Sequence, residues 1–210
     1  MLFVGDEKMS DLAQKLTPDE TALIVIDMQN DFCAEGGYLH NRFGRDMSSN
    51  LVLAKRIMET VEIARQAGVM IVWIKANYEP RYLGAAMKAN ADPNNICCEG
   101  GTWGWDFYEV TPLAGEPVIE KHCYNGFYET DLDKTLKSKK IKNLVMTGVA
   151  TNVCVESTLR EAYFNGYFVV MPEDLCAAGT PEFHQATVDN VRAYFGEVPK
   201  AAEVDEIWAS

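Results

Sequence analysis

The sequence predicts an α/β protein in which a mainly parallel sheet is covered by helices on both faces. Five short apolar runs alternate with segments of helical periodicity, which is typical of strand–helix–strand units. The runs are almost unbroken, as expected for strands that are buried on both faces. We expect these strands near residues 22–27, 69–75, 117–121, 142–148 and 167–172.

The segments between the strands carry apolar side chains at helical spacing, which predicts helices packed on the sheet. The first helix spans residues 49–67 and ends before Gly68, a common helix stop signal. Two others span residues 131–139 and 181–194, and residues 199–210 resemble a terminal strand or cap. The apolar positions of these helices, which we interpret as core packing, are Leu53, Ile57, Val61, Ala64, Leu132, Leu136, Phe183, Val188 and Val191.

Length and composition indicate one globular domain over residues 1–210. The chain has 210 residues, of which 48% are hydrophobic and 24% are charged. The net charge of −12 argues against a nucleic-acid partner or an anionic membrane surface, because both require a positive footprint. A small substrate is still compatible with this charge, since its binding depends on local groups.

No apolar stretch approaches the ~20 residues that a membrane helix needs, and residues 1–20 lack the order of a signal peptide. We therefore expect a cytoplasmic protein. Its six cysteines show no disulfide-scaffold spacing, so we interpret them as reduced thiols. Cys97 and Cys98 are adjacent, which does not fit the usual C-x-x-C zinc spacing, and we interpret this pair as a chance feature of a loop.

One cysteine stands where a buried strand passes into a helix. Residues 142–147 form the expected strand, residues 155–163 form the helix, and Cys154 falls in its first turn, with Asn152 as the expected N-cap. Unpaired N–H groups and the helix dipole favour a thiolate there. The alternative is a small buried cysteine with a packing role.

Two charged residues end other strands. Asp27 follows the apolar run of residues 21–26, and Lys121 ends the run that begins at Pro117. Carboxyl ends of strands in open α/β sheets face the crevice where ligands bind. Each charge alone could be a solvated strand end. Together with Cys154 they supply a base, a cation and a nucleophile at one edge of the sheet.

These three segments, in this order, resemble the isochorismatase-like superfamily of cysteine hydrolases, from about Thr21 to the end of the chain. Within it the chain looks closest to the ureidoacrylate and carbamoyl or biuret amidohydrolase branch. The motifs that carry the resemblance are Ile24-Val25-Ile26-Asp27-Met28-Gln29-Asn30-Asp31-Phe32, Gly36-Gly37-Tyr38-Leu39, Gly101-Thr102-Trp103, the Lys121 strand end, Tyr124-Asn125-Gly126-Phe127-Tyr128 and Thr147-Gly148-Val149-Ala150-Thr151-Asn152-Val153-Cys154-Val155-Glu156-Ser157-Thr158. The resemblance implies a three-layer α/β/α Rossmann-like fold with a mainly parallel central sheet.

The resemblance also implies an Asp–Lys–Cys triad formed by Asp27, Lys121 and Cys154. In such a triad the thiol attacks an amide or ureide carbonyl, Asp27 moves the proton, and Lys121 holds the carboxylate and helps to keep the thiolate charged. The backbone N–H groups of Ala150 and Cys154 are the expected oxyanion hole. Family members typically have a cis peptide between the positions of Val149 and Ala150.

The long segment of residues 76–115 interrupts the alternation of strands and helices, and loops of this length are usually functional. We expect it to form the wall and lid of the active site, with a subunit-contact loop as the alternative. The expected substrate-binding residues, chosen for donors that suit a small planar ureide or, for Arg81, a substrate carboxylate, are Gln29, Asn77, Tyr78, Arg81, Trp103 and Tyr124.

The reaction expected from these residues is metal-independent hydrolysis of a C–N bond in a small ureide such as ureidoacrylate. Nicotinamidase-like relatives carry an Asp-x-His-x-x-x-His metal motif where this chain has residues 76–81, and His40, His122 and His184 show no metal-ligand spacing. We expect no cofactor. Alternatives are a biuret or N-carbamoyl amino acid amidohydrolase and, in other classes, a catalytically silent scaffold or a thiol redox protein. A homo-oligomer is expected from the family.

Overall fold

The protein, described over residues 12–210 in a computed structural model, has a parallel sheet at its centre. Within the described residues the sheet has seven strands in the order β3-β2-β1-β4-β5-β7, with β6 beside the end of β4, and every strand pair is parallel. This confirms the predicted fold class. The strands are β1 (Thr21–Ile26), β2 (Met70–Ala76), β3 (Val118–Lys121), β4 (Asn143–Val149), β5 (Phe168–Val170), β6 (Cys176–Ala177) and β7 (Gly196–Glu197).

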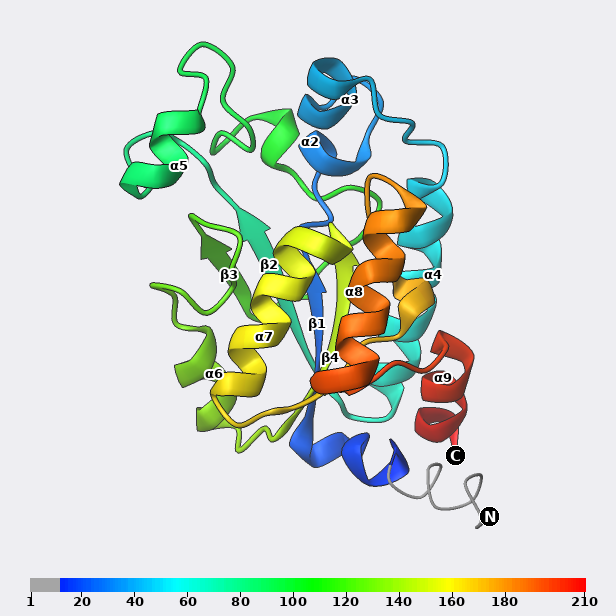
Figure 1. The fold of residues 1–210 in the computed structure, drawn as a ribbon. Coiled ribbons are helices and arrows are strands. Elements are labelled where there is room, and N and C mark those ends of the chain that lie inside the picture. Colours follow the sequence, from blue (N-terminus) through cyan, green and yellow to red (C-terminus); the bar gives the residue numbers. More distant parts are fainter. Residues whose placement is uncertain (1–11) are drawn as a thin grey trace.

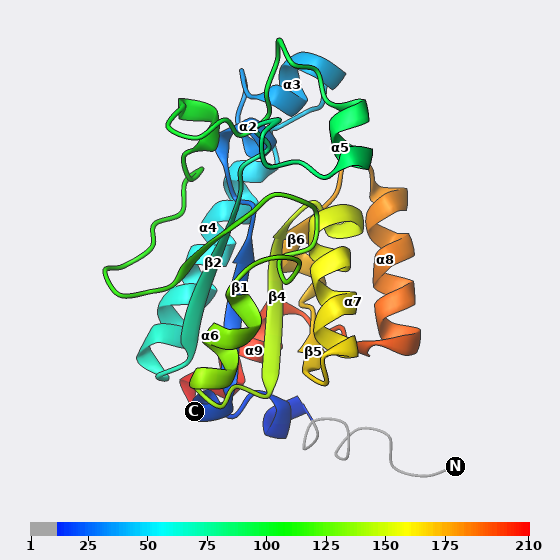
Figure 2. The same cartoon turned by 90° about the vertical axis from the view of Figure 1, so that its left-hand side faces the viewer.

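Helices cover both faces of the sheet, as Figures 1 and 2 show. α4 and α9 lie on one face, and α6, α7 and α8 lie on the other. The α-helices are α2 (Asn30–Cys33), α3 (Tyr38–Phe43), α4 (Asn50–Gln66), α5 (Ala85–Asn90), α6 (Leu132–Ser138), α7 (Glu156–Phe164), α8 (Pro181–Tyr194) and α9 (Ala201–Ala209). Shorter helical turns are η1 (Pro18–Glu20), η2 (Trp103–Trp105), η3 (Thr151–Val155) and η4 (Glu173–Leu175).

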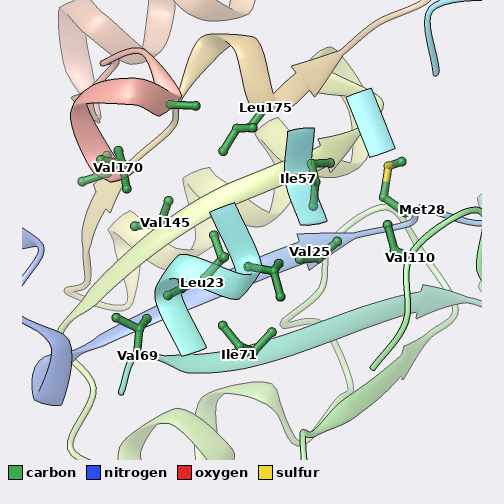
Figure 3. Close-up of a cluster of buried hydrophobic side chains, with 14 of the residues drawn as sticks. Leu23, Val25, Met28, Ile57, Val69, Ile71, Val110, Val145, Val170 and Leu175 are labelled. Atoms are coloured by element: carbon green, nitrogen blue, oxygen red, sulfur yellow. The ribbon is translucent and has the colours of Figure 1, made fainter. Parts of the chain in front are cut away.

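Alternating side chains of β1 divide the core into two parts. Leu23 and Val25 face α4, where they meet Ile57, whereas Ile24 and Ile26 belong to the cluster beneath α6, α7 and α8. Figure 3 shows the first cluster between β1, its neighbouring strands and α4. Successive side chains of a strand point to opposite faces of the sheet. The unbroken apolar run of β1 is therefore buried on both faces, as predicted.

Two sequence-based expectations differ from the structure. Phe183 is 54% exposed on α8, because the helix packs through Thr187, Val188 and Val191, so its assignment to the core was wrong. The C-terminal segment, for which a terminal strand or cap was expected, forms a helix, α9, so the strand was wrong. This helix buries Trp208, whose indole N–H donates to the Leu16 carbonyl at 2.9 Å.

The carboxyl ends of the strands lie beneath a layer formed by α2, α3 and α5 (Figure 1). Of the residues placed by the structure, none forms a helix that is both long and apolar enough to cross a bilayer. The layer of α2, α3 and α5 forms one side of a cavity at the ends of the strands.

Candidate active site

Asp27, Lys121 and Cys154 come from three strands of the sheet that end at one edge. Asp27 follows β1 directly, Lys121 is the last residue of β3, and Cys154 lies in η3, the turn that follows β4. Because the strands are parallel, their carboxyl ends meet at the same edge, as the sequence analysis expected. β1 lies between β2 and β4, which places Asp27 near the centre of this edge.

Gly148 allows β4 to approach β1 closely just before the site. Its φ is +112°, and a β carbon there would collide with the carbonyl oxygen of Ile26. Asp27, the next residue along β1, has a φ of 54°, a left-handed conformation that aspartate adopts more readily than most residues. Its N–H donates to the Ile74 carbonyl at 3.0 Å, which fixes the backbone from which the carboxylate projects.

Asp27 and Lys121 form an ion pair without solvent contact. Lys121 Nζ lies 2.8 Å from Asp27 Oδ2, and both side chains are 0% exposed. The ammonium also donates to the Cys123 carbonyl at 2.9 Å and to the Tyr78 hydroxyl at 3.3 Å, and these two hydrogen bonds help to hold it beside Asp27. Burial alone would lower the pKa of Lys121, but the nearby Asp27 carboxylate and the Cys154 sulfur raise it above its ordinary value.

The carboxylate of Asp27 has a higher proton affinity than an ordinary aspartate. Burial raises the pKa of Asp27, and the charge of Lys121 opposes this rise without cancelling it. A carboxyl group with these properties is suited to accept a proton and then release it, as a general base and acid requires. The pair therefore combines a permanent cation with a group that can move a proton.

The surroundings of Cys154 act in opposite directions on its thiol. Burial raises the pKa of Cys154 to about 12, although the charge of Lys121 acts in the opposite direction. The Tyr78 hydroxyl lies 3.8 Å from Sγ, and burial keeps the pKa of Tyr78 well above its ordinary value, so the tyrosine is a neutral phenol. Burial thus acts against the thiolate that the start of the helix was expected to favour.

The turn that carries Cys154 differs from the predicted helix start. Thr151–Val155 form a π-helical turn, and Ala150, not Asn152, precedes its first residue. The Ala150 carbonyl accepts hydrogen bonds from Val153 and Val155 at 3.0 and 3.2 Å. The assignment of Asn152 as the N-cap was wrong, since it lies inside the turn. The peptide between Val149 and Ala150 is cis, as the resemblance implied.

A cavity of about 610 Å³ lies above Cys154. Its walls come from residues 32–50, from residues 78–97, from Tyr124, from residues 149–154 around the turn and from residues 177–179 after β6. Asp27 and Lys121 lie outside this lining, so Cys154 is the one of these three residues at the cavity surface. The first part of the long segment after β2 thus forms a wall of the cavity.

Tyr78 and Tyr124 line the cavity, as expected for substrate-binding residues, and their rings meet edge to face at 6.3 Å. Gln29 does not reach it. Its buried side chain accepts from the Ala76 N–H at 2.7 Å and donates to the carbonyls of Ala76 and Trp105. Gln29 therefore joins the ends of β1 and β2 to η2, and a structural role replaces the expected one.

Three further candidates also lie off the cavity. The Asn77 side chain is buried and donates to the carboxylates of Glu79 and Glu120, each at 3.3 Å. Arg81 has 67% of its side chain exposed and pairs with Glu79 at 2.8 Å. Trp103 is 54% exposed in η2. These residues were expected to bind substrate because of their donors or, for Arg81, its charge, but none of the three lines the cavity.

Arg42 and Arg45 are cavity residues that the sequence analysis missed. Both line the cavity, Arg42 from α3 and Arg45 from the loop that follows it. The sequence signal that could have identified them is their position just after Gly36-Gly37-Tyr38-Leu39, a stretch already recognised as part of the resemblance. Neither arginine follows a strand directly, because α2 lies between β1 and α3.

Potential metal ligands gather at one place in the described part of the chain. Oxygen or sulfur atoms of Asp31, Cys97 and Cys98 lie within 4.8 Å of one another. Asp31 already accepts from the backbone N–H groups of Tyr38 at 3.0 Å and Cys98 at 2.6 Å, so its carboxylate anchors the loop. The histidines lie elsewhere: His122 stacks on Tyr82 and His184 is 2.9 Å from Thr151.

Comparisons with known proteins identify the family of this chain. Residues 21–203 match the isochorismatase domain family. The ureidoacrylate amidohydrolase RutB of Cronobacter sakazakii is 40% identical over 203 residues, which cover 89% of this chain and 87% of that protein. These matches show that the chain belongs to the isochorismatase domain family.

Solved structures of the same family share the fold. A cysteine hydrolase from Pseudomonas syringae pv. phaseolicola 1448A superposes with a TM-score of 0.81 at 25% identity, over 91% of this chain and 93% of that chain. The N-carbamoylsarcosine amidase from Thermoplasma acidophilum gives a TM-score of 0.69 at 25% identity, over 87% and 96% of the two chains. Both names describe hydrolases, and one of them describes an enzyme that acts on a carbamoyl compound.

Proposed function

We propose that this protein is a metal-independent cysteine amidohydrolase that cleaves a C–N bond of a small ureide such as ureidoacrylate. The observation that carries the proposal is the arrangement of Cys154 at the cavity surface above the buried Asp27–Lys121 pair. A nucleophile, a proton acceptor and a fixed cation then lie together where a carbonyl can enter. A catalytically silent scaffold would not require this combination, and a thiol redox protein would require a second thiol beside Cys154.

Catalysis begins with proton transfer from the Cys154 thiol. As Sγ forms a bond to the ureide carbonyl carbon, its proton passes to the Asp27 carboxylate, whose pKa burial raises. The charge of Lys121 stabilises the sulfur as it becomes anionic and keeps the carboxylate in place. A neutral resting thiol is compatible with this step, because proton transfer and attack occur together.

The carbonyl oxygen becomes negatively charged during the attack. In our proposal it lies against the backbone N–H groups of Ala150 and Cys154, both of which line the cavity. Collapse of the tetrahedral intermediate breaks the bond to the substituted nitrogen, and Asp27 returns its proton to that leaving group. The product of this half-reaction is S-carbamoyl Cys154.

Water completes the cycle. Asp27 accepts a proton from the water while the water oxygen forms a bond to the carbamoyl carbon. The C–S bond then breaks. Asp27 returns the proton to sulfur, which restores the thiol and releases carbamate. Carbamate decomposes to ammonia and carbon dioxide. The other product is the amine of the original ureide.

The substrate class is supported by the relatives and by the cavity. A relative that is 40% identical is named a ureidoacrylate amidohydrolase. Two arginines stand on the cavity wall, of which Arg42 pairs with Asp92, and a cation there favours an anionic ureide over biuret, which is uncharged at neutral pH. N-carbamoyl amino acids share the anionic character and are the second candidate, supported by the similarity to an N-carbamoylsarcosine amidase.

A cytoplasmic location and self-association complete the proposal. All six cysteines are free thiols, which suits a reducing compartment. Exposed aromatic side chains near the ends of α7 and α8, namely Phe164, Phe168 and Tyr194, support a homo-oligomer. Light scattering coupled to size-exclusion chromatography measures its order.

A panel of substrates tests the function. Ureidoacrylate, biuret, N-carbamoyl amino acids and simple amides are each incubated with the enzyme and with its Cys154→Ser variant, and ammonia release is measured. We expect the highest kcat/KM for ureidoacrylate, and less than about a tenth of the parent rate for the variant, a loss of more than ~1.4 kcal/mol of transition-state stabilisation. Efficient turnover of an unrelated amide with none of the ureides would overturn the substrate class.

A further inference from the structure

Of the two arginines that line the cavity, Arg45 is the one without a counter-ion among the described residues. Arg42 lies 3.5 Å from Asp92 through Nη1 and Oδ2. Asp46 accepts a hydrogen bond from the Ser48 N–H at 2.9 Å, which occupies its carboxylate in its own loop. Over residues 12–210, no carboxylate lies within ion-pair distance of the Arg45 guanidinium, although its side chain is half-buried.

The surroundings of Arg45 hold its guanidinium against the backbone. Phe43 lies beneath the group, with Cζ 5.6 Å from the centre of the ring. Gly179 is also close to the group: a β carbon there would be 3.0 Å from Arg45 Cζ and 3.2 Å from Nη1. A glycine at position 179 therefore leaves room for the guanidinium, and both residues line the cavity.

The position of Gly179 relates Arg45 to the reacting thiol. Ala177 of β6 pairs with Val149 of β4, the residue just before the proposed oxyanion hole. Gly179 is two residues further along, hence no more than about 7.6 Å from Ala177 between α carbons. Arg45 thus lies beside the segment that follows β6, and it lines the same cavity as the turn that carries Cys154.

We propose that Arg45 binds the carboxylate of an anionic ureide and so determines which ureides this enzyme accepts. A half-buried guanidinium without a counter-ion can donate two parallel hydrogen bonds to a carboxylate that enters the cavity. The carbonyl at the other end of the substrate then reaches Cys154. This inference rests on the proposed ureide amidohydrolase function, and it replaces Arg81, which points away from the cavity, as the carboxylate-binding residue.

Binding measurements in the Cys154→Ala background separate recognition from catalysis. Isothermal titration calorimetry compares ureidoacrylate with its uncharged carboxamide, which has the same shape. We expect Arg45→Gln to raise the Kd of ureidoacrylate by about tenfold or more and to change that of the carboxamide little. Arg45→Lys, which keeps the charge but loses the planar fork, is expected to be intermediate.

Two further variants provide controls. Arg42→Gln removes a cavity arginine that already has a counter-ion. We expect it to raise the Kd of ureidoacrylate less than Arg45→Gln does. Gly179→Ala keeps the charge of Arg45 but moves its guanidinium, which is the flexible end of the side chain. This variant should also weaken the binding of ureidoacrylate and leave that of the carboxamide little changed. Thermal unfolding of each variant verifies that the fold is intact.

The outcomes distinguish this inference from the function on which it rests. If the wild-type enzyme fails to turn over ureidoacrylate, the proposed function is wrong and the inference falls with it. If the wild-type enzyme turns it over but Arg45→Gln binds ureidoacrylate as tightly as the parent, the inference alone is wrong. A selective loss of affinity for ureidoacrylate in Arg42→Gln or Arg81→Gln, with no such loss in Arg45→Gln, would show that another arginine binds the substrate carboxylate.

Discussion

The Lys121 ammonium lies 2.8 Å from the Asp27 carboxylate, and neither side chain is exposed to solvent. A buried ion pair contributes little net stability, because desolvation of both charges offsets their attraction. Loss of one partner is far more costly, since the other charge stays buried and unpaired. The pair is therefore better explained by its chemistry beside Cys154 than by a contribution to stability.

Lys121→Met is expected to reduce the free energy of unfolding by about 3–5 kcal/mol, because it leaves the Asp27 carboxylate buried and unpaired. Urea denaturation measures this loss. Lys137→Ala is the matched control, since Lys137 pairs with Asp133 at 2.7 Å but is 62% exposed. That variant should lose no more than about 1 kcal/mol. Equal losses in the two variants would contradict the burial of the Asp27–Lys121 pair.

Alkylation of Cys154 by iodoacetamide tests the state of the resting thiol. With a pKa of about 12, Cys154 has a thiolate fraction that grows about tenfold per pH unit across the neutral and alkaline range. The rate at Cys154 should therefore be low at pH 7 and still rise above pH 9. Peptide mass spectrometry separates this site from the more exposed Cys97 and Cys123. A rate that levels off below pH 8 would show a resting thiolate instead.

Removal of metal ions should leave turnover of the ureide unchanged, because the proposed attack by Cys154 uses only side chains and backbone N–H groups. Kinetics before and after exhaustive dialysis against a chelator measure the effect. The cluster of Asp31, Cys97 and Cys98 makes the comparison informative, since these groups could bind a metal ion. Loss of rate that added zinc, iron or manganese restores would refute the metal-independent mechanism.

Gly148→Ala is expected to destabilise the protein by more than ~3 kcal/mol, because the new methyl group meets the Ile26 carbonyl and the φ of +112° disfavours a side chain. Gly166→Ala is a matched control: its φ is +89°, but a β carbon there meets no atom within 4 Å. Its cost is expected to be about 1 kcal/mol. Thermal or chemical unfolding measures the stability of the two variants. Similar losses of stability in both would contradict the close approach of β4 to β1.

The fold could be predicted from the sequence because its signals are local and repeated. Unbroken apolar runs identified β1, β2 and β4, and the buried face of α4 followed from its helical spacing. The proposed triad could also be predicted, since in a parallel sheet residues that follow different strands meet at one edge.

The walls of the cavity could not be predicted in the same way. Gln29 and Asn77 stand next to strand ends, yet hydrogen bonds to the backbone and to carboxylates turn both into the protein. Arg45 reaches the cavity from a loop after α3, and its contact with Gly179 joins segments more than a hundred residues apart. Such contacts depend on tertiary packing, which a local pattern does not encode.

The most direct test of the central claim is mass spectrometry of the enzyme quenched in acid during turnover of ureidoacrylate. The proposed mechanism predicts a carbamoyl group on the peptide that contains Cys154, absent without substrate and absent from the Cys154→Ala variant. Asp27→Asn, which cannot transfer the proton, should bind ureidoacrylate without accumulating this adduct. Turnover by the wild-type enzyme with no adduct on Cys154, or undiminished turnover by Cys154→Ala, would contradict a covalent mechanism at this thiol.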